Sequence, residues 1–356
     1  MFPENGDGAK IVIDRNFAVM RSILVIRLTS MGDVVLATPL LRQLRRTYPD
    51  ARIDVAVADR FADVWANNPH VTIVWPVPSV HASESGVDEL KLEMLESLSG
   101  EWGGAYDLIV DLQHSLRSAT LRRGLGSTVV RAPKYRMEKL AMVYLKRRPA
   151  VTTSIVERYR STVGHLGLAP DTDGCEVWLP EEHAYPSVRP ALERMRVALV
   201  PGAHHATKRW PAVRYAELAA SLVRSGREVV LLGGPSDVEL CSAVAAASGV
   251  PVLRADGATS IEATVRMLDT CSCVVTNDTG VMHLAAARRV PVVAIFGSTV
   301  RELGFAPYGT PHRIVEHDVA CRPCSHIGRA TCPKHHFRCM EGIAVSDVLR
   351  AVSELM

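Results

Sequence analysis

Short apolar runs rich in β-branched residues alternate with amphipathic stretches along this chain, and the whole alternation occurs twice. The first series of predicted strands is Ser22–Leu28, Arg52–Ala58, Val71–Trp75 and Tyr106–Leu112. The second series is Val197–Val200, Glu228–Leu232, Val250–Leu253, Cys273–Val275 and Val292–Phe296. Strands that alternate with helices in this way predict βαβ units and therefore parallel sheets. The pattern indicates an α/β protein with two similar halves.

Helical spacing of apolar residues marks the segments between these strands. The predicted helices are Val34–Tyr48, Val87–Leu98, Pro211–Val223, Asp237–Ala247 and Ser260–Leu268. Pro39 lies in the first turns of the first helix, where we expect it to bend the helix axis.

The length and the proline pattern predict how the chain is divided. A chain of 356 residues is long enough for two domains, and residues 170–190 hold four prolines among acids and small polar residues. We expect a flexible extension at 1–21, a first domain at 22–180, a linker at 181–193, a second domain at 194–345 with a cysteine-rich loop at 321–339, and a C-terminal helix at 346–356.

The overall composition excludes several classes of protein. Lys and Arg number 41 against 38 Asp and Glu, and the net charge of +3 argues against a dedicated nucleic-acid binder. No apolar run approaches the roughly 18–20 residues that span a bilayer, and no secretory signal peptide is recognisable. We therefore expect a cytoplasmic protein whose eight cysteines are thiols or metal ligands rather than disulfides.

The stretch Val274–Ala287, VVTNDTGVMHLAAA, is the strongest candidate for a ligand site. It reads as a buried strand, a small polar turn and a helix N-terminus. The first N–H groups of a helix lack internal partners and carry the positive end of the helix dipole, so this turn can hold a phosphate. Gly280 lets an anion approach the backbone, and His283 can add a hydrogen bond. The alternative is an ordinary strand-to-helix turn with an Asx cap.

Three loops of the second half follow predicted strands and could face one ligand. In open parallel sheets, ligands bind outside the carboxyl ends of the strands. Threonine hydroxyls, a lysine and helix N-termini suit a diphosphate, and an acid one strand away suits ribose hydroxyls. The residues that these loops present are Gly202, Thr207 and Lys208, then Gly233, Gly234 and Asp237, then Asp278, Thr279, Gly280 and His283.

The first half lacks a GxGxxG motif after its first strand, which argues against a dinucleotide oxidoreductase. The residues at that place are Ser30-Met31-Gly32-Asp33. Asp33 at a strand-to-helix turn can be a simple helix cap. It can also be a carboxylate that faces the cleft between the two halves.

Residues 116–148 carry ten Lys and Arg residues against one acid, Glu138. A solvated surface is the ordinary explanation for such a run. The imbalance is local, however, and favours contact with the phosphates of a large acceptor or with an anionic lipid leaflet. The apolar residues 140–145 suit a shallow membrane contact. On charge alone, Arg117, Arg122 and Arg123 are the candidate acceptor-binding residues.

Four cysteines, Cys321, Cys324, Cys332 and Cys339, have the spacing C-x2-C-x7-C-x6-C with histidines between them. Compact spacing with a leading CxxC suggests a structural zinc site. Four reduced thiols in a packed loop, or a stress-induced disulfide, are the alternatives. The other four cysteines have the character of small core residues.

Several segments together resemble glycosyltransferase family 9, the heptosyltransferases. The stretch Ile23–Pro39, ILVIRLTSMGDVVLATP, resembles the N-terminal signature of that family. Pro201–Pro211, PGAHHATKRWP, and Thr276–Ala286, TNDTGVMHLAA, resemble its two donor-site signatures. Tyr106–Ala119 and Gly304–Gly309 fit as well, so the resemblance covers nearly everything from Met20 onwards.

The resemblance implies a GT-B fold, in which an acceptor-binding and a nucleotide-sugar-binding Rossmann-like domain face a central cleft. It implies inverting transfer of a heptose from ADP-heptose to the lipopolysaccharide inner core, with no metal or other cofactor needed for the chemistry. Asp33 would be the general base on the acceptor hydroxyl. Lys208, with Thr207 and the Thr279–Gly280 amides, would stabilise the ADP leaving group, and Asp237 would contact the ribose.

We therefore expect a heptosyltransferase at the cytoplasmic face of the inner membrane, in peripheral contact with it. Three alternatives stay open: a sugar-nucleotide epimerase, a non-catalytic nucleotide-sugar-binding protein, and a transferase for another sugar and glycan. The sequence does not separate a lipid A–Kdo acceptor from a heptosyl acceptor.

Overall fold

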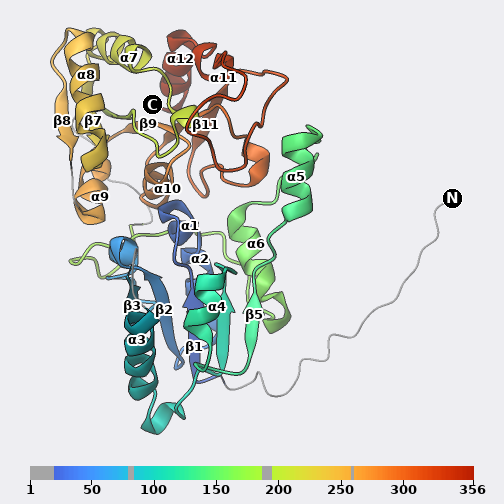
Figure 1. Ribbon diagram of the computed structural model, residues 1–356. Helices are drawn as coiled ribbons and strands as arrows, with labels where there is room; N and C mark the ends of the chain where they lie inside the picture. Colours follow the sequence, from blue (N-terminus) through green and yellow to red (C-terminus); the bar gives the residue numbers. More distant parts are fainter. Residues whose placement is uncertain (1–19, 79–83, 187–194, 258–259) are drawn as a thin grey trace.

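The computed structural model describes residues 20–78, 84–186, 195–257 and 260–356. The predicted extension at 1–21 lies almost wholly outside these residues, and so does the second half of the predicted linker at 181–193. Two parallel sheets, one above the other in Figure 1, form the centres of two α/β domains.

The N-terminal sheet has five parallel strands in the order β3-β2-β1-β4-β5. Because the order reverses beside β1, the loops after β1 and β4 leave a crevice at the carboxyl edge of the sheet. The strands are β1 (Ser22–Ile26), β2 (Arg52–Ala58), β3 (Ile73–Val77), β4 (Leu108–Asp111) and β5 (Val129–Arg131).

The C-terminal sheet has six parallel strands in the order β11-β10-β9-β6-β7-β8. This order repeats the pattern of the first sheet, with β6 in the place of β1 and β9 in the place of β4. The strands are β6 (Arg196–Val200), β7 (Glu228–Gly233), β8 (Leu253–Asp256), β9 (Cys273–Asn277), β10 (Val292–Phe296) and β11 (His312–Glu316).

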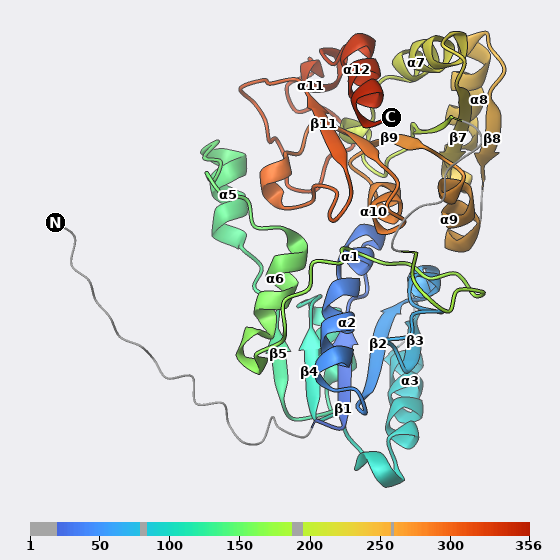
Figure 2. The ribbon, with the colours of Figure 1, turned by 180° about the vertical axis from the view of Figure 1, so that it is seen from behind.

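Helices cover the faces of both sheets, as Figures 1 and 2 show from opposite sides. The N-terminal helices are α1 (Met31–Leu36), α2 (Thr38–Thr47), α3 (Glu84–Ser97), α4 (Leu116–Arg122), α5 (Arg136–Tyr144) and α6 (Ile155–Thr162). The C-terminal helices are α7 (Ala212–Arg224), α8 (Val238–Ser248), α9 (Ile261–Asp269), α10 (Gly280–Ala287), α11 (Arg338–Glu341) and α12 (Val345–Leu355).

Two predicted elements differ from the observed ones for identifiable reasons. The single helix predicted over 34–48 is two helices that meet at Ala37, because Pro39 lies at the start of α2 and cannot continue the hydrogen bonds of α1. The strand predicted at 250–253 begins only at Leu253. Gly249 ends α8 in the left-handed region, and Pro251 has no N–H to offer a neighbouring strand.

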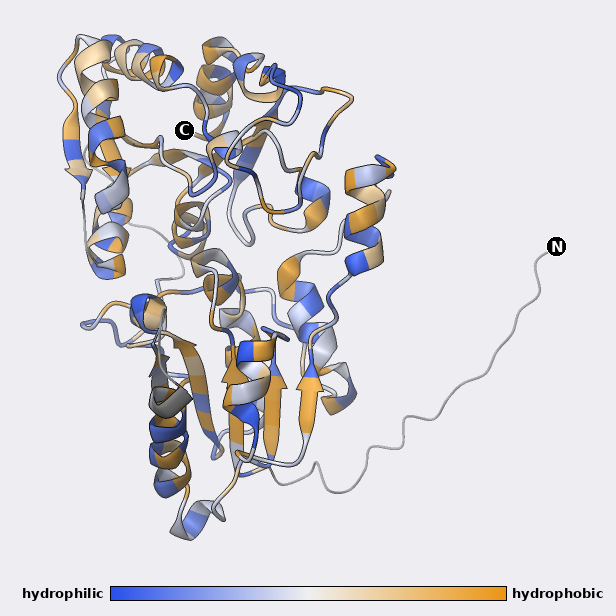
Figure 3. Ribbon diagram, in the orientation of Figure 1, coloured by the Kyte–Doolittle hydropathy of each residue, from blue (hydrophilic) through white to orange (hydrophobic). Residues whose placement is uncertain are grey.

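The apolar core is continuous from one domain to the other. Residues of β1 and α1 and residues of β9, β10 and α10 belong to one buried cluster. Figure 3 shows the hydrophobic strands of the N-terminal sheet, which supply much of it. Among the described residues, no helix combines the length and the apolar composition that crossing a bilayer would require.

The chain passes from the first domain to the second through a segment that is tied to both. On the N-terminal side, Arg42 of α2 pairs with Asp171 at 2.7 Å and with Glu176 at 2.5 Å, and all three are buried. On the C-terminal side, Arg288 pairs with Glu182 at 2.7 Å. These contacts fix where the two domains face each other.

Candidate functional site

A cavity of about 630 Å³ lies between the two domains, at the carboxyl edges of both sheets. In each sheet, the strand order reverses at one place, the switch point, and one loop from each switch point lines the cavity. A few side chains from neighbouring loops complete the lining. The N-terminal domain contributes Thr29, Ser30, Met31, Gly32, Asp33, Arg60 and Phe61. The C-terminal domain contributes His204, His205, Lys208, Asp278, Thr279, Gly280, His283, Val300, Leu303, Phe305, His326 and Ile327.

Each domain holds its switch-point loop with one amide side chain. Gln113, just after β4, accepts hydrogen bonds from the backbone N–H groups of Leu28 and Thr29 at 3.2 and 3.1 Å. Asn277, at the end of β9, donates to the carbonyls of Pro201 and Gly202 at 2.9 and 3.2 Å. Fixed loops present their side chains to the cavity in a defined direction.

Asp33 lies in the first turn of α1 and all its acceptor positions are occupied. Its Oδ1 pairs with Arg27 at 2.6 Å and accepts the Tyr159 hydroxyl at 3.0 Å. Its Oδ2 accepts the Ser30 hydroxyl at 2.8 Å and the Ser30 amide at 3.2 Å. Burial raises the pKa of Asp33, but the Arg27 charge and the Ser30 hydrogen bonds outweigh burial and hold the pKa below its usual range. Asp33 is therefore ionised at neutral pH.

Arg27 and Tyr159, which contact Asp33 directly, were not predicted from the sequence. Arg27 also donates to the carbonyl of Leu112 at 2.8 Å, so the guanidinium joins the loops after β1 and β4. Burial raises the pKa of the Tyr159 phenol well above its ordinary value, which keeps it a neutral donor. The one available signal was a single cation inside the apolar run Ile23–Leu28.

Lys208 faces Asp33 from the opposite domain and is paired within its own. Its Nζ lies 2.7 Å from Asp278 Oδ2 and 3.2 Å from the Asp278 carbonyl. Asp278 Oδ2 also accepts the Thr299 hydroxyl at 2.7 Å. The lysine is thus held at the cavity wall by a carboxylate that is itself fixed.

The N-terminus of α10 opens into the cavity without a side-chain cap. Thr279 precedes the helix in an extended conformation, and its side chain bonds no helix amide. A Cβ on Gly280 would overlap the side chain of Met31, and a Cβ on Gly32 would overlap the His283 ring. The two glycines therefore allow α1 and α10, one from each domain, to touch at the cleft.

His283 is buried at this contact between α1 and α10. Its ring is 2% exposed, and its Nδ1 has no hydrogen-bond partner among the described residues. Burial lowers its pKa from 6.5 to about 4, although the nearby Asp278 and Asp33 oppose the change. His283 is therefore neutral at pH 7, and its unsatisfied Nδ1 is fully buried.

Three of the predicted donor-site residues do not line the cavity. Gly202 packs against the carboxylate of Asp237, which accepts a hydrogen bond from the Gly234 amide at 3.0 Å. The Thr207 hydroxyl donates to the Arg329 carbonyl at 3.0 Å and accepts from the Arg329 amide at 2.8 Å. In the structure, Thr207 therefore anchors the cysteine-rich loop, whereas Lys208, Asp278, Thr279, Gly280 and His283 face the cavity.

The arginines predicted as acceptor contacts do not line either of two cavities at the cleft. Arg117 donates to the carbonyl of Pro78, and Arg122 pairs with Asp111 at 3.3 Å. Arg123 ends α4 and lines neither cavity. Position in a basic run did not indicate which cations face the cleft.

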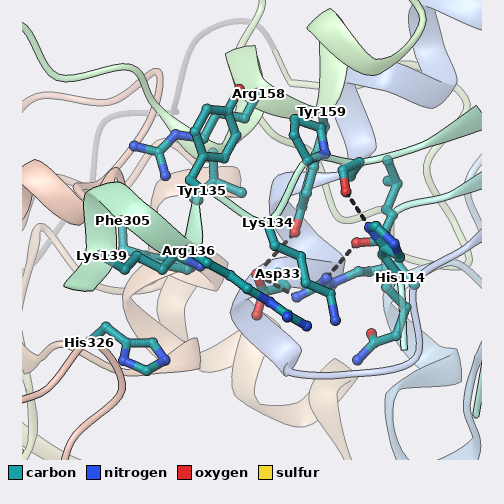
Figure 4. A pocket seen from close by; sticks show the side chains of 16 residues that line it. Asp33, His114, Lys134, Tyr135, Arg136, Lys139, Arg158, Tyr159, Phe305 and His326 are labelled. Atoms are coloured by element: carbon teal, nitrogen blue, oxygen red, sulfur yellow. Dashed lines mark hydrogen bonds and ion pairs between the residues drawn. The ribbon is translucent and has the colours of Figure 1, made fainter. Parts of the chain in front are cut away.

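A second cavity of about 320 Å³ lies beside Asp33 and is strongly basic (Figure 4). Lys134, Arg136, Lys139 and Arg158 line it, and within the described chain none of the four forms an ion pair. Burial and the neighbouring Arg158 charge lower the pKa of Lys139, and the Nε of Arg158 is buried without a partner. Unpaired, mutually repelling cations favour an anionic ligand.

The four clustered cysteines are free thiols near the first cavity. Burial raises the pKa of the Cys332 thiol, but backbone N–H groups of residues 334–337 outweigh burial and lower it. Among the described residues, no three Cys, His, Asp or Glu side chains converge as metal ligands do. The zinc site therefore stays a prediction, and elemental analysis of the purified protein tests it.

A family model for glycosyltransferase family 9 (heptosyltransferase) matches residues 99–335. The chain is also 30% identical over 293 residues to lipopolysaccharide heptosyltransferase 2 of Escherichia coli. That alignment covers 77% of this chain and 82% of the relative.

Two solved structures share the fold. The glycosyltransferase family 9 protein of Veillonella parvula has a TM-score of 0.78 at 23% identity, with 94% of this chain and 97% of that chain covered. The ADP-heptose lps heptosyltransferase II of E. coli has a TM-score of 0.66 at 24% identity, with 94% and 98% covered. The predicted GT-B fold is confirmed.

Proposed function

Because the chain belongs to glycosyltransferase family 9 and is a glycosyltransferase, we propose that it moves a heptose from ADP-heptose to the lipopolysaccharide inner core. One observation carries the proposal. Asp33 of the first domain and Lys208 with the α10 N-terminus of the second line a single interdomain cavity. A base and a diphosphate site on opposite walls are what an inverting transfer requires.

Asp33 takes the proton of the acceptor hydroxyl in this proposal. As that oxygen forms its bond to the anomeric carbon, the bond from the same carbon to the diphosphate breaks, and the electron pair leaves with ADP. The acceptor hydroxyl replaces the exposed Ser30 hydroxyl at Oδ2, while the Ser30 amide keeps the carboxylate in place. A positioned base contributes about 10²–10⁴-fold in rate.

Lys208 and the first amides of α10 stabilise the departing ADP. Negative charge grows on the diphosphate as the glycosidic bond breaks, and donors fixed in advance interact with it most strongly. The uncapped helix end adds its dipole to the Lys208 charge. This charge stabilisation needs no metal ion.

The basic cavity beside Asp33 holds the anionic part of the acceptor. Lys134, Arg136, Lys139 and Arg158 are unpaired cations near the proposed base, whereas Arg117 and Arg122 have partners elsewhere. Sugar acids and phosphates of the lipopolysaccharide core match this charge. Since that acceptor is lipid-linked, we place the reaction at the cytoplasmic face of the inner membrane.

The direct test measures ADP release from ADP-heptose, with lipid A–Kdo or a heptosylated core as acceptor. The wild type should turn over only when acceptor is present, and Asp33→Ala should lose at least 100-fold in rate while it still binds ADP. Glu89→Ala, an exposed carboxylate of α3, is the matched control. Conversion of ADP-heptose to a different ADP-sugar without acceptor and without release of ADP would identify an epimerase instead. Thermal stabilisation by UDP or GDP but not by ADP would show that the donor carries a different nucleotide.

A further inference from the structure

Helix α5 has two chemically different faces. Arg136 and Lys139 line the basic cavity, and on the same side Met142 packs against Val300 and Leu303 of the other domain. The opposite side carries Met137, Leu140, Tyr144 and Leu145, with exposed fractions of 75%, 48%, 70% and 63%. Spacings of three and four residues place Met137, Leu140 and Tyr144 on one stripe, and Leu145 follows at the C-terminal end of the helix.

A third of the exposed large apolar residues in the described part of the chain lies on or directly after α5. Twelve large apolar side chains are exposed in the described part of the chain, and four of them fall between residues 137 and 145. Figures 1 and 2 show α5 on the outer flank of the molecule, beyond α6. Contiguous apolar surface of this kind marks an interaction site rather than ordinary surface.

Cations flank the stripe, and this selects the kind of partner. Residues 131–148 contain seven Lys and Arg residues and one acid, Glu138. Arg147 is exposed directly after the stripe. Lysine and arginine around an apolar helical face are the pattern of helices that lie in the headgroup region of an anionic bilayer.

The orientation of α5 is fixed from its C-terminal end. The Nζ of Lys146 donates to the carbonyls of Cys321 and Pro323 at 3.0 and 2.9 Å, and Arg148 pairs with Asp318 at 3.4 Å. These contacts tie the end of α5 to the C-terminal domain. The apolar stripe is therefore presented outward on a rigid support.

We propose that the outer face of α5 docks this protein on an anionic lipid bilayer. A second step, which rests on the proposed function, follows from this docking. The same helix presents the headgroup of a membrane-anchored acceptor to the cavity lined by Arg136 and Lys139. Apolar residues enter the headgroup region on one face of the helix, and cations bind the anionic sugar on the other. Docking and acceptor binding are thereby coupled through nine residues, Arg136–Tyr144.

Vesicle sedimentation of the full-length protein tests the docking surface. The probes are vesicles of 70% phosphatidylcholine and 30% phosphatidylglycerol, with pure phosphatidylcholine as the neutral comparison. The triple variant Met137→Ser, Leu140→Ser and Tyr144→Ser should bind the anionic vesicles at least tenfold more weakly than the wild type. The matched control replaces three exposed apolar residues of the C-terminal domain, Val213, Val238 and Leu253, by serine and should bind as the wild type does.

Three results would each overturn the docking proposal. Equal vesicle binding by the triple variant and the wild type, or none by the wild type, overturns the proposal. A wild-type dimer that the triple variant converts to a monomer in sedimentation velocity, without vesicle binding, makes this face a contact between two copies and also overturns it. Retained far-ultraviolet circular dichroism and melting temperature show that the variant is folded.

The activity measurement separates docking from the proposed function. With a deacylated, water-soluble acceptor the triple variant should transfer at the wild-type rate, and with acceptor embedded in vesicles it should be at least tenfold slower. If the wild type transfers to neither acceptor but still needs the α5 face for vesicle binding, the proposed function fails and the docking surface stands.

Discussion

Replacement of His283 by glutamine should flatten the dependence of stability on pH. The folded-state pKa of His283 is lowered by burial to about 4, against an ordinary value of 6.5. The unfolded chain therefore takes up a proton as the pH falls below 6.5, and the folded chain does so only near pH 4. Stability contributed by the neutral ring is present above pH 6.5 and is lost as the pH falls through this window.

The magnitude follows from the two pKa values of His283. In the window between them, the free energy of unfolding falls by about 1.4 kcal/mol for each pH unit. Between pH 7 and pH 5 the loss from this one residue is about 2 kcal/mol, and at pH 4 it reaches about 3 kcal/mol. Glutamine keeps a donor and an acceptor but does not titrate, so the variant lacks this component.

Urea unfolding at pH 7 and pH 5 measures the effect, with the buried Trp210 as a fluorescent reporter in the same domain. The wild type should lose about 2 kcal/mol more than His283→Gln between the two pH values. His183→Gln, at an exposed position, should behave as the wild type. Identical pH dependence of wild type and His283→Gln would refute the claim that His283 is buried and neutral.

Three further predictions concern the proposed reaction. Asp33→Ala should cost about 3 kcal/mol in urea unfolding as well as activity, because the partly buried Arg27 is left without its carboxylate partner; unchanged stability would contradict the observed pair. Lys208→Ala should weaken ADP binding by calorimetry and slow transfer together, whereas unchanged ADP affinity would place the diphosphate elsewhere. Arg136→Ser with Lys139→Ser should raise the acceptor KM at least tenfold and leave ADP affinity intact, and the control Arg117→Ser should change neither the KM nor the ADP affinity.

Much of the fold could be predicted because hydrophobic periodicity is strong in long, buried elements. Strands β1, β2, β9 and β10 are wholly buried and read directly from their apolar runs. Strand β5 has only three residues and β11 is half-exposed, so neither gave a periodic signal. Short or half-exposed edge strands depend on their neighbours more than on their own sequence.

Part of the candidate site could be predicted because loops after parallel strands meet at one edge of a sheet. That reasoning placed Lys208 and His283 at one cavity, whereas Asp33, which follows a strand of the other sheet, was placed opposite them by the family resemblance. It could not give the direction of neighbouring side chains. In the 3₁₀ helix η5 (Ala206–Lys208), successive side chains point about 120° apart, so Lys208 faces the cavity and Thr207 faces the cysteine-rich loop.

Contacts between residues far apart in the chain could not be predicted from the sequence. Tyr159 meets Asp33 across 126 positions, and nothing in the α6 sequence marks it. Arg27 gave no separate signal, because it directly follows the apolar strand β1 and lies within the apolar run of the sequence. A basic run likewise shows where cations are abundant but not which of them lack a carboxylate partner.

The surroundings of Asp33 favour ionisation over basicity, and this suits the proposed chemistry. A carboxylate buried between two domains would be protonated without a nearby cation, and a protonated acid cannot accept the acceptor hydroxyl's proton. Arg27 and Ser30 prevent that, at the cost of a weaker base. The cost is small where the anomeric carbon already carries positive charge, because the acceptor hydroxyl becomes strongly acidic as its new bond forms. Orientation and charge state of Asp33 then matter more to the rate than its affinity for a proton.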